Sequence, residues 1–432
     1  MYMFSPDKII RTGTQKRGNK MNEVKKETKK IQATETMKSV MAASFKELDD
    51  AVKSKSKKIA WCTSVGPAEL LRSMGFLVYF PENHGAMLGS SRMAADLIPA
   101  ANAKGFSPDI CSYLTSDIGS YLTGNTPLKK AYGMEMPKPD VLVFNTNQCR
   151  DVKDWFDWYG REFDKPSIGV FTHRNIGEIK NYELDDIAQQ FKDLIPTLES
   201  IAGVKFDMDR FRETVKLSRQ CSELWKSCLA LSEKTPSPWN FFDHTIHMGP
   251  AVVLRGTKEA VDYYSLLKKE LDERAAAGVS SIGNEKLRIY WDGMPVWGKL
   301  RTFSDLFQSL DTCVVASTYC NSWIFTQLDE NDPFRSMARA YTELFIARDE
   351  EYKIKYMTDL HSRYKFNGII FHDAKTCPNN SNNRYGMPER LQKHLGTPTL
   401  TINGDLNDLR LFSEQQSITN VEAFIEQLNE VA

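Results

Sequence analysis

Residues 368–380 read "GIIFHDAKTCPNN" and join a short apolar run to a loop that carries a thiol. The run from Gly368 to Phe371 predicts a β-strand, and Cys377 and Pro378 follow it in the loop. In open α/β proteins the side chains that follow a strand lie at the carboxyl edge of the sheet, where ligands bind. The stretch therefore predicts an α/β fold in which a cysteine thiol faces a binding cleft.

Similar apolar runs recur along the chain, with helical patterns between them, and this alternation predicts parallel sheets. In the first half we expect strands in "KKIAWC" (57–62), "GFLVYF" (75–80), "PDVLVFNTN" (139–147) and "PSIGVF" (166–171). In the second half we expect them in "AVVL" (251–254), "LRIYWDG" (287–293), "DTCVVAST" (311–318), "NGIIFHDA" (367–374) and "TPTLTIN" (397–403).

The order of these patterns predicts two parallel-sheet domains of the Rossmann or flavodoxin-like kind, joined by a helical bridge and preceded by a helical arm. A chain of 432 residues is long enough for more than one domain. The expected boundaries are 1–55 for the arm, 56–178 for the first α/β domain, 179–250 for the bridge and 251–432 for the second α/β domain. We also expect a helix from about Thr257 to Ala277 and a last helix, "NVEAFIEQL", capped by Thr419.

The composition and charge of the chain do not favour a nucleic-acid-binding or membrane protein. The 56 basic and 56 acidic residues cancel, so no overall field favours nucleic acid or a membrane surface, and the Lys-rich first sixty residues are interpreted as a solvated helical arm. No run is apolar enough for a membrane span and the N-terminus lacks the apolar core of a signal peptide, so we expect a cytoplasmic protein. "GTQKRGNK" at 13–20 superficially resembles a phosphate-binding loop, but Asn19 stands where the loop requires Lys, and no strand precedes the segment. No ATP site is therefore expected in this chain.

Three of the eight cysteines fall where strands end or helices begin. Cys149 follows the strand at 139–147, Cys377 follows the strand at 367–374, and Cys111 lies near the expected helix entrance at 108–109. A thiolate near a helix N-terminus has a lowered pKa and is a better metal ligand. The separations of 38 and 228 residues differ from the tight spacing of ferredoxins, so burial as ordinary apolar residues stays open. Cys62 is a possible fourth neighbour, whereas the others are expected to be buried: Cys221, Cys228, Cys313 and Cys320.

Several segments carry a resemblance to a known family. They are "IAWCTSVGPAELLRSMGF", "DICSY", "NTNQC", "FHDAKTCP" and "GDLNDLRLFSEQQSITNVEAFIEQL". From about residue 55 to its end, the chain resembles the benzoyl-CoA reductase and 2-hydroxyacyl-CoA dehydratase superfamily. "WDGMPVWGKLR" (291–301) and "TPSPWNFFDH" (235–244) look closer to the larger active-site subunit, of the B type, of ATP-dependent aromatic acyl-CoA reductases.

The resemblance implies a [4Fe-4S] cluster held by Cys111, Cys149 and Cys377. It further implies an iron–sulfur subunit of a dearomatising benzoyl-CoA reductase of anaerobic aromatic catabolism, an oxidoreductase that passes single electrons from the cluster to the CoA thioester. The implied partners are a homologous cluster-bearing subunit, an ATPase activator that uses the ATP, reduced ferredoxin upstream and the acyl-CoA substrate. The alternatives are an (R)-2-hydroxyacyl-CoA dehydratase subunit, a non-catalytic electron-relay or scaffold subunit, and an α/β protein without metal.

Other candidate site residues are aromatic or titratable. The aromatic residues that could form flat apolar walls for an acyl group are Trp239, Phe241, Phe242, Trp291 and Trp297. The candidate proton donors or acceptors are Glu69, His84, His244 and His247. Core packing, ordinary hydrogen bonding and, for Glu69, the helix dipole are the simpler explanations. Asp373 and His372 precede Cys377 and are candidates for orienting its loop or bonding the cluster sulfurs.

Overall fold

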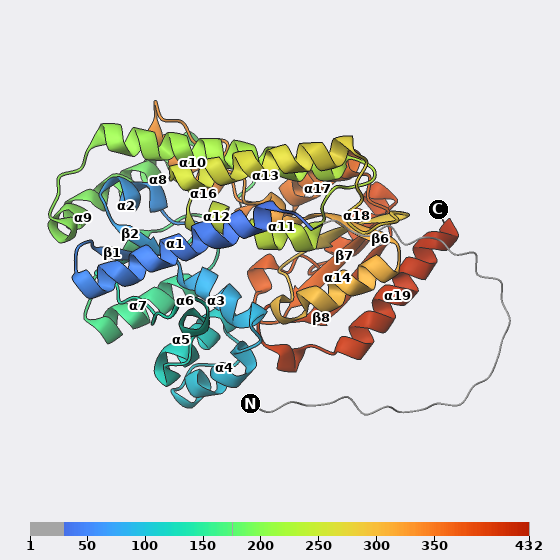
Figure 1. The fold of residues 1–432 in the computed structure, drawn as a ribbon, viewed down its shortest axis with the longest axis horizontal. Coiled ribbons are helices and arrows are strands. Elements are labelled where there is room, and N and C mark those ends of the chain that lie inside the picture. The colour runs from blue at the N-terminus through green and yellow to red at the C-terminus, as the bar shows by residue number, and fades with distance from the viewer. Residues whose placement is uncertain (1–29, 175, 432) are drawn as a thin grey trace.

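The computed structural model describes residues 30–174 and 176–431, and these contain two four-stranded parallel sheets (Figure 1). The first sheet has the order β2-β1-β3-β4 and comprises β1 (Ile59–Cys62), β2 (Leu77–Tyr79), β3 (Val141–Asn145) and β4 (Ser167–Val170). The second has the order β6-β5-β7-β8 and comprises β5 (Leu287–Asp292), β6 (Thr312–Ser317), β7 (Gly368–Ala374) and β8 (Thr399–Gly404). The predicted fold class, with two parallel-sheet domains, is confirmed.

Both sheets repeat one strand order, and this places a topological switch point in each. The chain first adds a strand on one side of β1 or β5 and then crosses to the other side with β3 or β7. In such sheets the crevice for ligands opens at the carboxyl ends of the two strands beside the switch. Every residue of β3, β5 and β6 is buried, which is expected where helices cover both faces of a parallel sheet.

Helices connect and cover the strands. Those up to the end of β4 are α1 (Ala33–Ser54), α2 (Ala68–Ser73), α3 (Pro81–Ser90), α4 (Ala94–Ala103), α5 (Ser112–Thr123), α6 (Pro127–Tyr132) and α7 (Asp151–Phe163). Between the sheets in the sequence come α8 (Asn181–Asp193), α9 (Ile195–Ala202), α10 (Met208–Leu229), the 3-10 turn η1 (Ala230–Glu233), α11 (Phe241–His247), α12 (Gly249–Val253) and α13 (Lys258–Ala276). The second sheet carries η2 (Trp297–Lys299), α14 (Leu300–Ser309), α15 (Thr318–Asn321), α16 (Pro333–Thr342), η3 (Phe345–Ala347), α17 (Glu350–Tyr364), η4 (Pro378–Asn380), α18 (Met387–Leu395), η5 (Leu409–Leu411) and α19 (Glu414–Val431).

The two long helices α10 and α13, which come between the sheets in the sequence, run side by side (Figure 1). Asp207 accepts the backbone N–H groups of Asp209 and Arg210 in the first turn of α10, and Thr257 accepts that of Ala260 in the first turn of α13, so polar caps begin both helices. Cys221 and Cys228 lie buried on α10, as predicted for small apolar residues in a helix interface.

Two local predictions are wrong. Residues 251–254 were expected to form a strand, but 251–253 belong to α12 and Leu254 follows it; Pro250 lies in the first turn, where a missing N–H costs nothing. A short apolar run fits a strand and a buried helix equally well, so the pattern alone could not decide. The last helix begins at Glu414, and Thr419 therefore lies inside α19 and does not cap it.

The described part of the N-terminal arm is helical, as predicted, but one face of this helix packs against the protein instead of being solvated. Met41, Phe45 and Leu48 of α1 are buried, and the Phe45 ring stacks on Tyr132 with centroids 4.5 Å apart. The first turn of α1 is held from α13, because the carboxylate of Glu270 accepts backbone N–H bonds from residues 32 and 33. The segment 13–20 and the rest of residues 1–29 lie outside the described residues.

No helix in the described part of the chain combines the length and apolar character that a membrane crossing requires.

Candidate functional site

Cys111, Cys149 and Cys377 line a single cavity of about 140 Å³. Cys111 directly precedes α5, Cys149 lies two residues before α7, and Cys377 directly precedes η4. All three are half-buried, whereas the other five cysteines are buried. The cavity is lined by residues that follow strands of both sheets, so it lies where the two carboxyl edges meet.

Each of the three thiols receives a backbone N–H. The donors are Leu114 for Cys111, Val152 for Cys149 and Asn380 for Cys377, and each of these bonds lowers the pKa of its thiol. Burial has the larger, opposite effect: it raises the pKa of Cys149 and of Cys377 to about 12 and that of Cys111 well above its ordinary value.

The thiols also affect one another, since Cys149 and Cys377 each raise the pKa of Cys111. Three thiolates in one partly buried cavity are stable together only beside a compensating positive charge, and a metal centre provides one. The donor set therefore fits an iron–sulfur cluster bound by three cysteines: soft thiolates, converging on one cavity, each with a backbone N–H donor.

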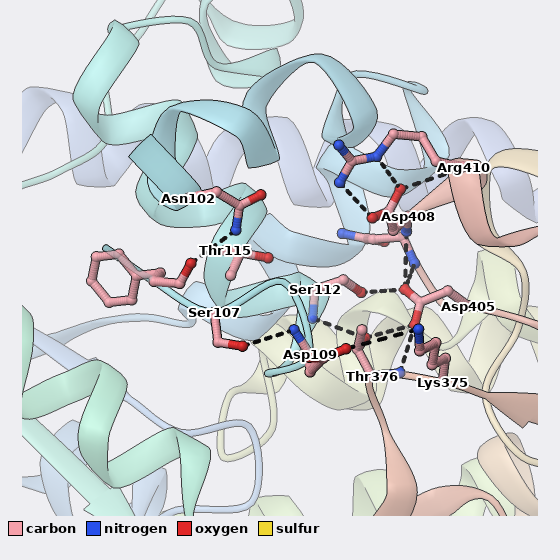
Figure 2. Close-up of polar contacts among 12 residues, drawn as sticks. Asn102, Ser107, Asp109, Ser112, Thr115, Lys375, Thr376, Asp405, Asp408 and Arg410 are labelled. Atoms are coloured by element: carbon pink, nitrogen blue, oxygen red, sulfur yellow. Dashed lines mark hydrogen bonds and ion pairs between the residues drawn. The ribbon is translucent and has the colours of Figure 1, made fainter. Parts of the chain in front are cut away.

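A buried carboxylate fixes the first cysteine loop to the third (Figure 2). Asp405, after β8, accepts hydrogen bonds from the Ser112 hydroxyl and from the backbone N–H and hydroxyl of Thr376, the last two at 2.8 and 2.6 Å. The backbone N–H groups of Asn407 and Asp408 donate to the same carboxylate. Ser112 follows Cys111 and Thr376 precedes Cys377, so Asp405 sets the spacing of these two thiols.

The second cysteine loop is joined to the first by Asp151. Its carboxylate accepts the backbone N–H of Cys111 at 3.1 Å, and Asp151 is itself the first residue of α7, two positions after Cys149. Two carboxylates therefore connect all three thiol-bearing loops.

Glu82 is a cavity carboxyl that the sequence analysis missed. It lies in the first turn of α3, half-buried, and lines the cavity. The backbone N–H of Ser64 and the side-chain amide of Gln148, the latter at 3.2 Å, donate to it. Burial raises the pKa of Glu82 above its ordinary value. The one available signal was an acidic residue in the first turn after a strand, which is common for helix-dipole reasons alone.

Of the predicted aromatic wall, Trp297 lines the cavity, and its indole N–H donates to the hydroxyl of Tyr113, which also faces the cavity. Trp155 of α7, and Tyr319 and Trp323 from the segment after β6, also belong to the aromatic lining and were not anticipated. The other predicted residues do not line this cavity and pack in the core: Trp239, Phe241, Phe242 and Trp291.

The predicted proton-transfer residues lie away from the cavity lining. His84 bonds Asp117 at 2.5 Å and Thr126 at 2.8 Å in a buried cluster. His244 contacts the Ser232 hydroxyl at 3.1 Å, and burial lowers the pKa of His244 well below its ordinary value.

Glu69 is fully buried and does not line the cavity. Its carboxylate accepts bonds from Ser218 at 2.6 Å and Tyr341 at 2.5 Å and lies 3.3 Å from Nε of Arg255. These contacts indicate a structural role for Glu69, which lies in the first turn of α2.

Cys62 is buried at the end of β1 and does not line the cavity with the other three thiols. His372 contacts the Met294 carbonyl through Nδ1 at 2.6 Å, and Asp373 lies 3.4 Å from Arg384. Both side chains are near the Cys377 loop, and neither lines the cavity.

Within the described residues no group of three or more His, Cys, Asp or Glu side chains is close enough to share one metal ion. Ligands of a cubane cluster bind different iron atoms at separate corners, so their sulfurs stand farther apart than the ligands of a single ion.

The fold and this cavity define an α/β protein with a thiol-lined site at the carboxyl edges of two parallel sheets. The family described as 2-hydroxyglutaryl-CoA dehydratase, D-component, matches residues 63–428. The chain belongs to this family, as the resemblance in its sequence indicated.

Relatives carry both dehydratase and reductase names. The chain is 32% identical to the (R)-2-hydroxyisocaproyl-CoA dehydratase alpha subunit of Clostridioides difficile, over 88% of this chain and 92% of the relative. It is 29% identical to the (R)-phenyllactyl-CoA dehydratase alpha subunit of Clostridium sporogenes, over 88% and 90%. It is 28% identical to the B subunit of benzoyl-CoA reductase from Thauera aromatica, over 91% and 94%.

Proposed function

We propose that this chain is the cluster-binding subunit of an enzyme that eliminates water from a 2-hydroxyacyl-CoA, with Cys111, Cys149 and Cys377 holding a [4Fe-4S] cluster. The observation that carries the proposal is the convergence of these thiols on one cavity at the switch points of both sheets. The family match and the dehydratase names of relatives support water elimination ahead of the ring reduction that the sequence segments favoured.

When bound through three thiolates, such a cluster would supply single-electron transfer and one iron open to a substrate oxygen. The chain's own groups would then handle protons and solvent. Elimination of water requires that a proton leave one carbon and hydroxide leave its neighbour. Glu82 is the cavity carboxyl placed to exchange that proton, and burial raises its pKa above the ordinary value.

Apolar side chains around Glu82 exclude water from the acyl group. Met248 and Val252 come from the region of α12, Trp297 from the segment after β5, and Leu406 from the segment after β8. A dry wall of this kind protects a reactive intermediate from solvent protons. Ser64 and Gln148 fix the Glu82 carboxyl in place, so its orientation does not depend on the substrate.

A second candidate function is reduction of an aromatic acyl-CoA. The chain covers 94% of the B subunit of benzoyl-CoA reductase, and the aromatic side chains of Trp297, Tyr319 and Trp323 offer flat surfaces for a ring. The same cluster ligands serve both candidates.

We further propose that the chain works with a homologous second subunit, an ATPase activator and an upstream reduced ferredoxin. The names of relatives as alpha or B subunits support a multi-subunit enzyme. Identification of the proteins that co-purify with the full chain under anaerobic conditions tests this composition.

The cluster assignment is tested by iron, sulfide and EPR measurements on anaerobically purified protein. Cys149→Ser should lose most of the cluster signal, whereas Cys228→Ser, at a buried thiol of α10, should keep it. An unchanged cluster in Cys149→Ser would remove the assignment. The reaction is tested with the assembled complex: enoyl-CoA from an (R)-2-hydroxyacyl-CoA supports dehydration, and a cyclic dienoyl-CoA from benzoyl-CoA supports the second candidate instead.

A further inference from the structure

A second cavity, of about 300 Å³, adjoins the cysteine cavity and is strongly basic. Ile346 and Asn379 line both cavities, so the two share a wall. We call the second one the cationic pocket. Its charged lining consists of one acidic residue, Glu350, and four basic ones: Arg174, Arg348, Lys353 and Arg384.

Most of this positive charge has no carboxylate partner. Among the described residues, Arg174, Arg348 and Lys353 form no ion pair, and Arg384 reaches only Asp373, at 3.4 Å. The one lining carboxylate, Glu350, is already bound to Arg390 outside the pocket. The field inside the pocket is therefore positive and attracts an anion.

Three of the cationic side chains donate hydrogen bonds to uncharged oxygen atoms. Their positive charge is therefore not neutralised, and their remaining N–H groups can donate to a ligand. Arg174 donates to the Gln148 carbonyl beside Cys149, and Lys353 donates to the Asn382 side chain at 3.0 Å. Arg348 donates to the Ile176 carbonyl at 3.0 Å. The Nε of Arg384 is buried and has no hydrogen-bond partner within the described part of the chain.

Burial makes the charged forms of these side chains energetically unfavourable. It lowers the pKa of Arg174 and of Lys353, and for Lys353 the nearby charge of Arg174 acts in the same direction while Asp292 opposes it. Partly buried cations without paired carboxylates are destabilising unless a ligand supplies the opposite charge. Their position beside the cysteine-lined cavity is typical of a functional site, and their charge favours an anion as the ligand.

The rim of the cationic pocket carries an exposed aromatic residue. Tyr385 is 88% exposed, more than any other large hydrophobic side chain in the described residues. It adopts a φ of 56°, which non-glycine residues rarely adopt and which is found at ligand-binding segments. An exposed aromatic ring beside a phosphate-binding field is suited to stack on a nucleotide base.

We infer that the cationic pocket binds the phosphates of the CoA portion of the substrate, with Tyr385 against the adenine and the pantetheine chain passing Ile346 and Asn379 into the cysteine cavity. The inference rests on the proposed acyl-CoA substrate and not on the choice between dehydration and ring reduction. Phosphate recognition by several cations at once would fix the thioester at the cavity mouth.

The test is the affinity of the assembled complex for free CoA, measured by calorimetry without turnover. Lys353→Met and Arg384→Gln should each weaken CoA about tenfold, since each removes one charge-assisted contact. Lys355→Met is the matched control, because Lys355 is exposed on the same helix and does not line the pocket. Tyr385→Ala should weaken CoA and Tyr385→Phe should not. Iron content should remain at the wild-type value in all of these variants.

A truncated ligand separates phosphate binding from other causes. An acyl-pantetheine, which lacks the nucleotide, should bind wild type and Lys353→Met equally. Equal CoA affinity in wild type, Lys353→Met and Arg384→Gln would overturn the inference. Inorganic pyrophosphate that binds as tightly as CoA would also overturn it. So would variants that bind CoA normally but no longer bind an acidic partner protein. Because the readout is CoA binding, a complex that binds CoA through these residues but fails to dehydrate would count against the proposed reaction alone.

Discussion

The backbone N–H of Ser112 donates to Oγ1 of Thr376 at 3.0 Å, so the residue after the first candidate cluster cysteine is bonded to the residue before the third. These two residues are 264 positions apart in the chain. Both also bond the buried carboxylate of Asp405. The spacing of Cys111 and Cys377 is thus set by hydrogen bonds between loops of different sheets.

Loss of Asp405 should loosen this arrangement. Asp405→Ala leaves buried donors on Ser112, Thr376 and two backbone groups without an acceptor, so we expect a loss of about 3 kcal/mol or more in the free energy of unfolding. Iron content per chain should fall with it. Urea denaturation and iron analysis under anaerobic conditions measure both. Asp186→Asn, at an exposed carboxylate, should change neither, and a fully loaded, stable Asp405→Ala would contradict the role given to Asp405.

Gly119 allows α5 to pack closely on α4. A Cβ added there would lie 2.1 Å from the Leu97 carbonyl oxygen, which belongs to backbone and cannot turn aside. Gly119→Ala should therefore destabilise the protein by about 2 kcal/mol. Gly249→Ala is the control, because its nearest atom would be Met41 at 3.8 Å. Equal denaturation midpoints for the two variants would disprove the packing argument.

Glu270 should determine how firmly the start of α1 is held. Its carboxylate accepts the backbone N–H groups of Gln32 and Ala33 at 2.6 and 2.8 Å. Glu270→Ala should cost about 1 kcal/mol and speed amide hydrogen exchange in the first turns of α1. Glu273→Ala, on the exposed side of α13, should leave exchange unchanged. Exchange rates in α1 that do not respond to Glu270→Ala would count against this cap.

Asp292 should give the stability a specific pH dependence. Burial raises its pKa from 3.8 to about 6, so the folded protein binds this proton more tightly than the unfolded chain. The free energy of unfolding then falls as the pH rises from about 4 to about 6, by about 3 kcal/mol from this group. Asp292→Asn should remove that component of the slope. Asp243, whose pKa is also raised to about 6, keeps its own contribution, so the difference between wild type and variant isolates Asp292.

Ionisation of Glu82 should determine how the reaction rate falls at low pH, which is the acid limb of the pH–rate profile. If its ionised form accepts the substrate proton, the rate falls as the pH drops through its raised pKa, at higher pH than an ordinary carboxyl would give. Glu82→Gln should lower kcat about 100-fold or more and abolish this limb, with iron content unchanged. Glu426→Gln, exposed on α19, serves as the control. An unaltered pH profile in Glu82→Gln would exclude this role.

Strands such as β3 and β5 were predictable because their side chains face hydrophobic layers on two sides, whereas β4 and β8 are only partly buried. The run 287–293 is apolar throughout most of its length for this reason, and its buried strand β5 matches. The run 251–254 is entirely apolar but forms part of a helix, because Pro250 begins a turn that α12 continues. Local composition could not distinguish the two cases, since the difference lies in what each segment packs against.

The convergence of the cysteines was accessible from sequence through one rule, that strand ends gather at the carboxyl edge of a parallel sheet. Which aromatic residues face the cavity was not accessible. Trp291 and Trp297 are six positions apart, yet the first stacks on Phe241 in the core and the second lines the cavity. Glu82 carried no motif, and only its approach to Ser64 and Gln148 across the fold reveals its position.

The repeated strand order has a consequence for assembly. Cys111 and Cys149 belong to the half of the chain built on the first sheet, and Cys377 belongs to the half built on the second. A cluster bound by all three would act as an inorganic cross-link between the halves. Its oxidative loss would remove that cross-link and leave the halves joined by their shared hydrophobic core and by the hydrogen bonds of Ser112, Thr376 and Asp405.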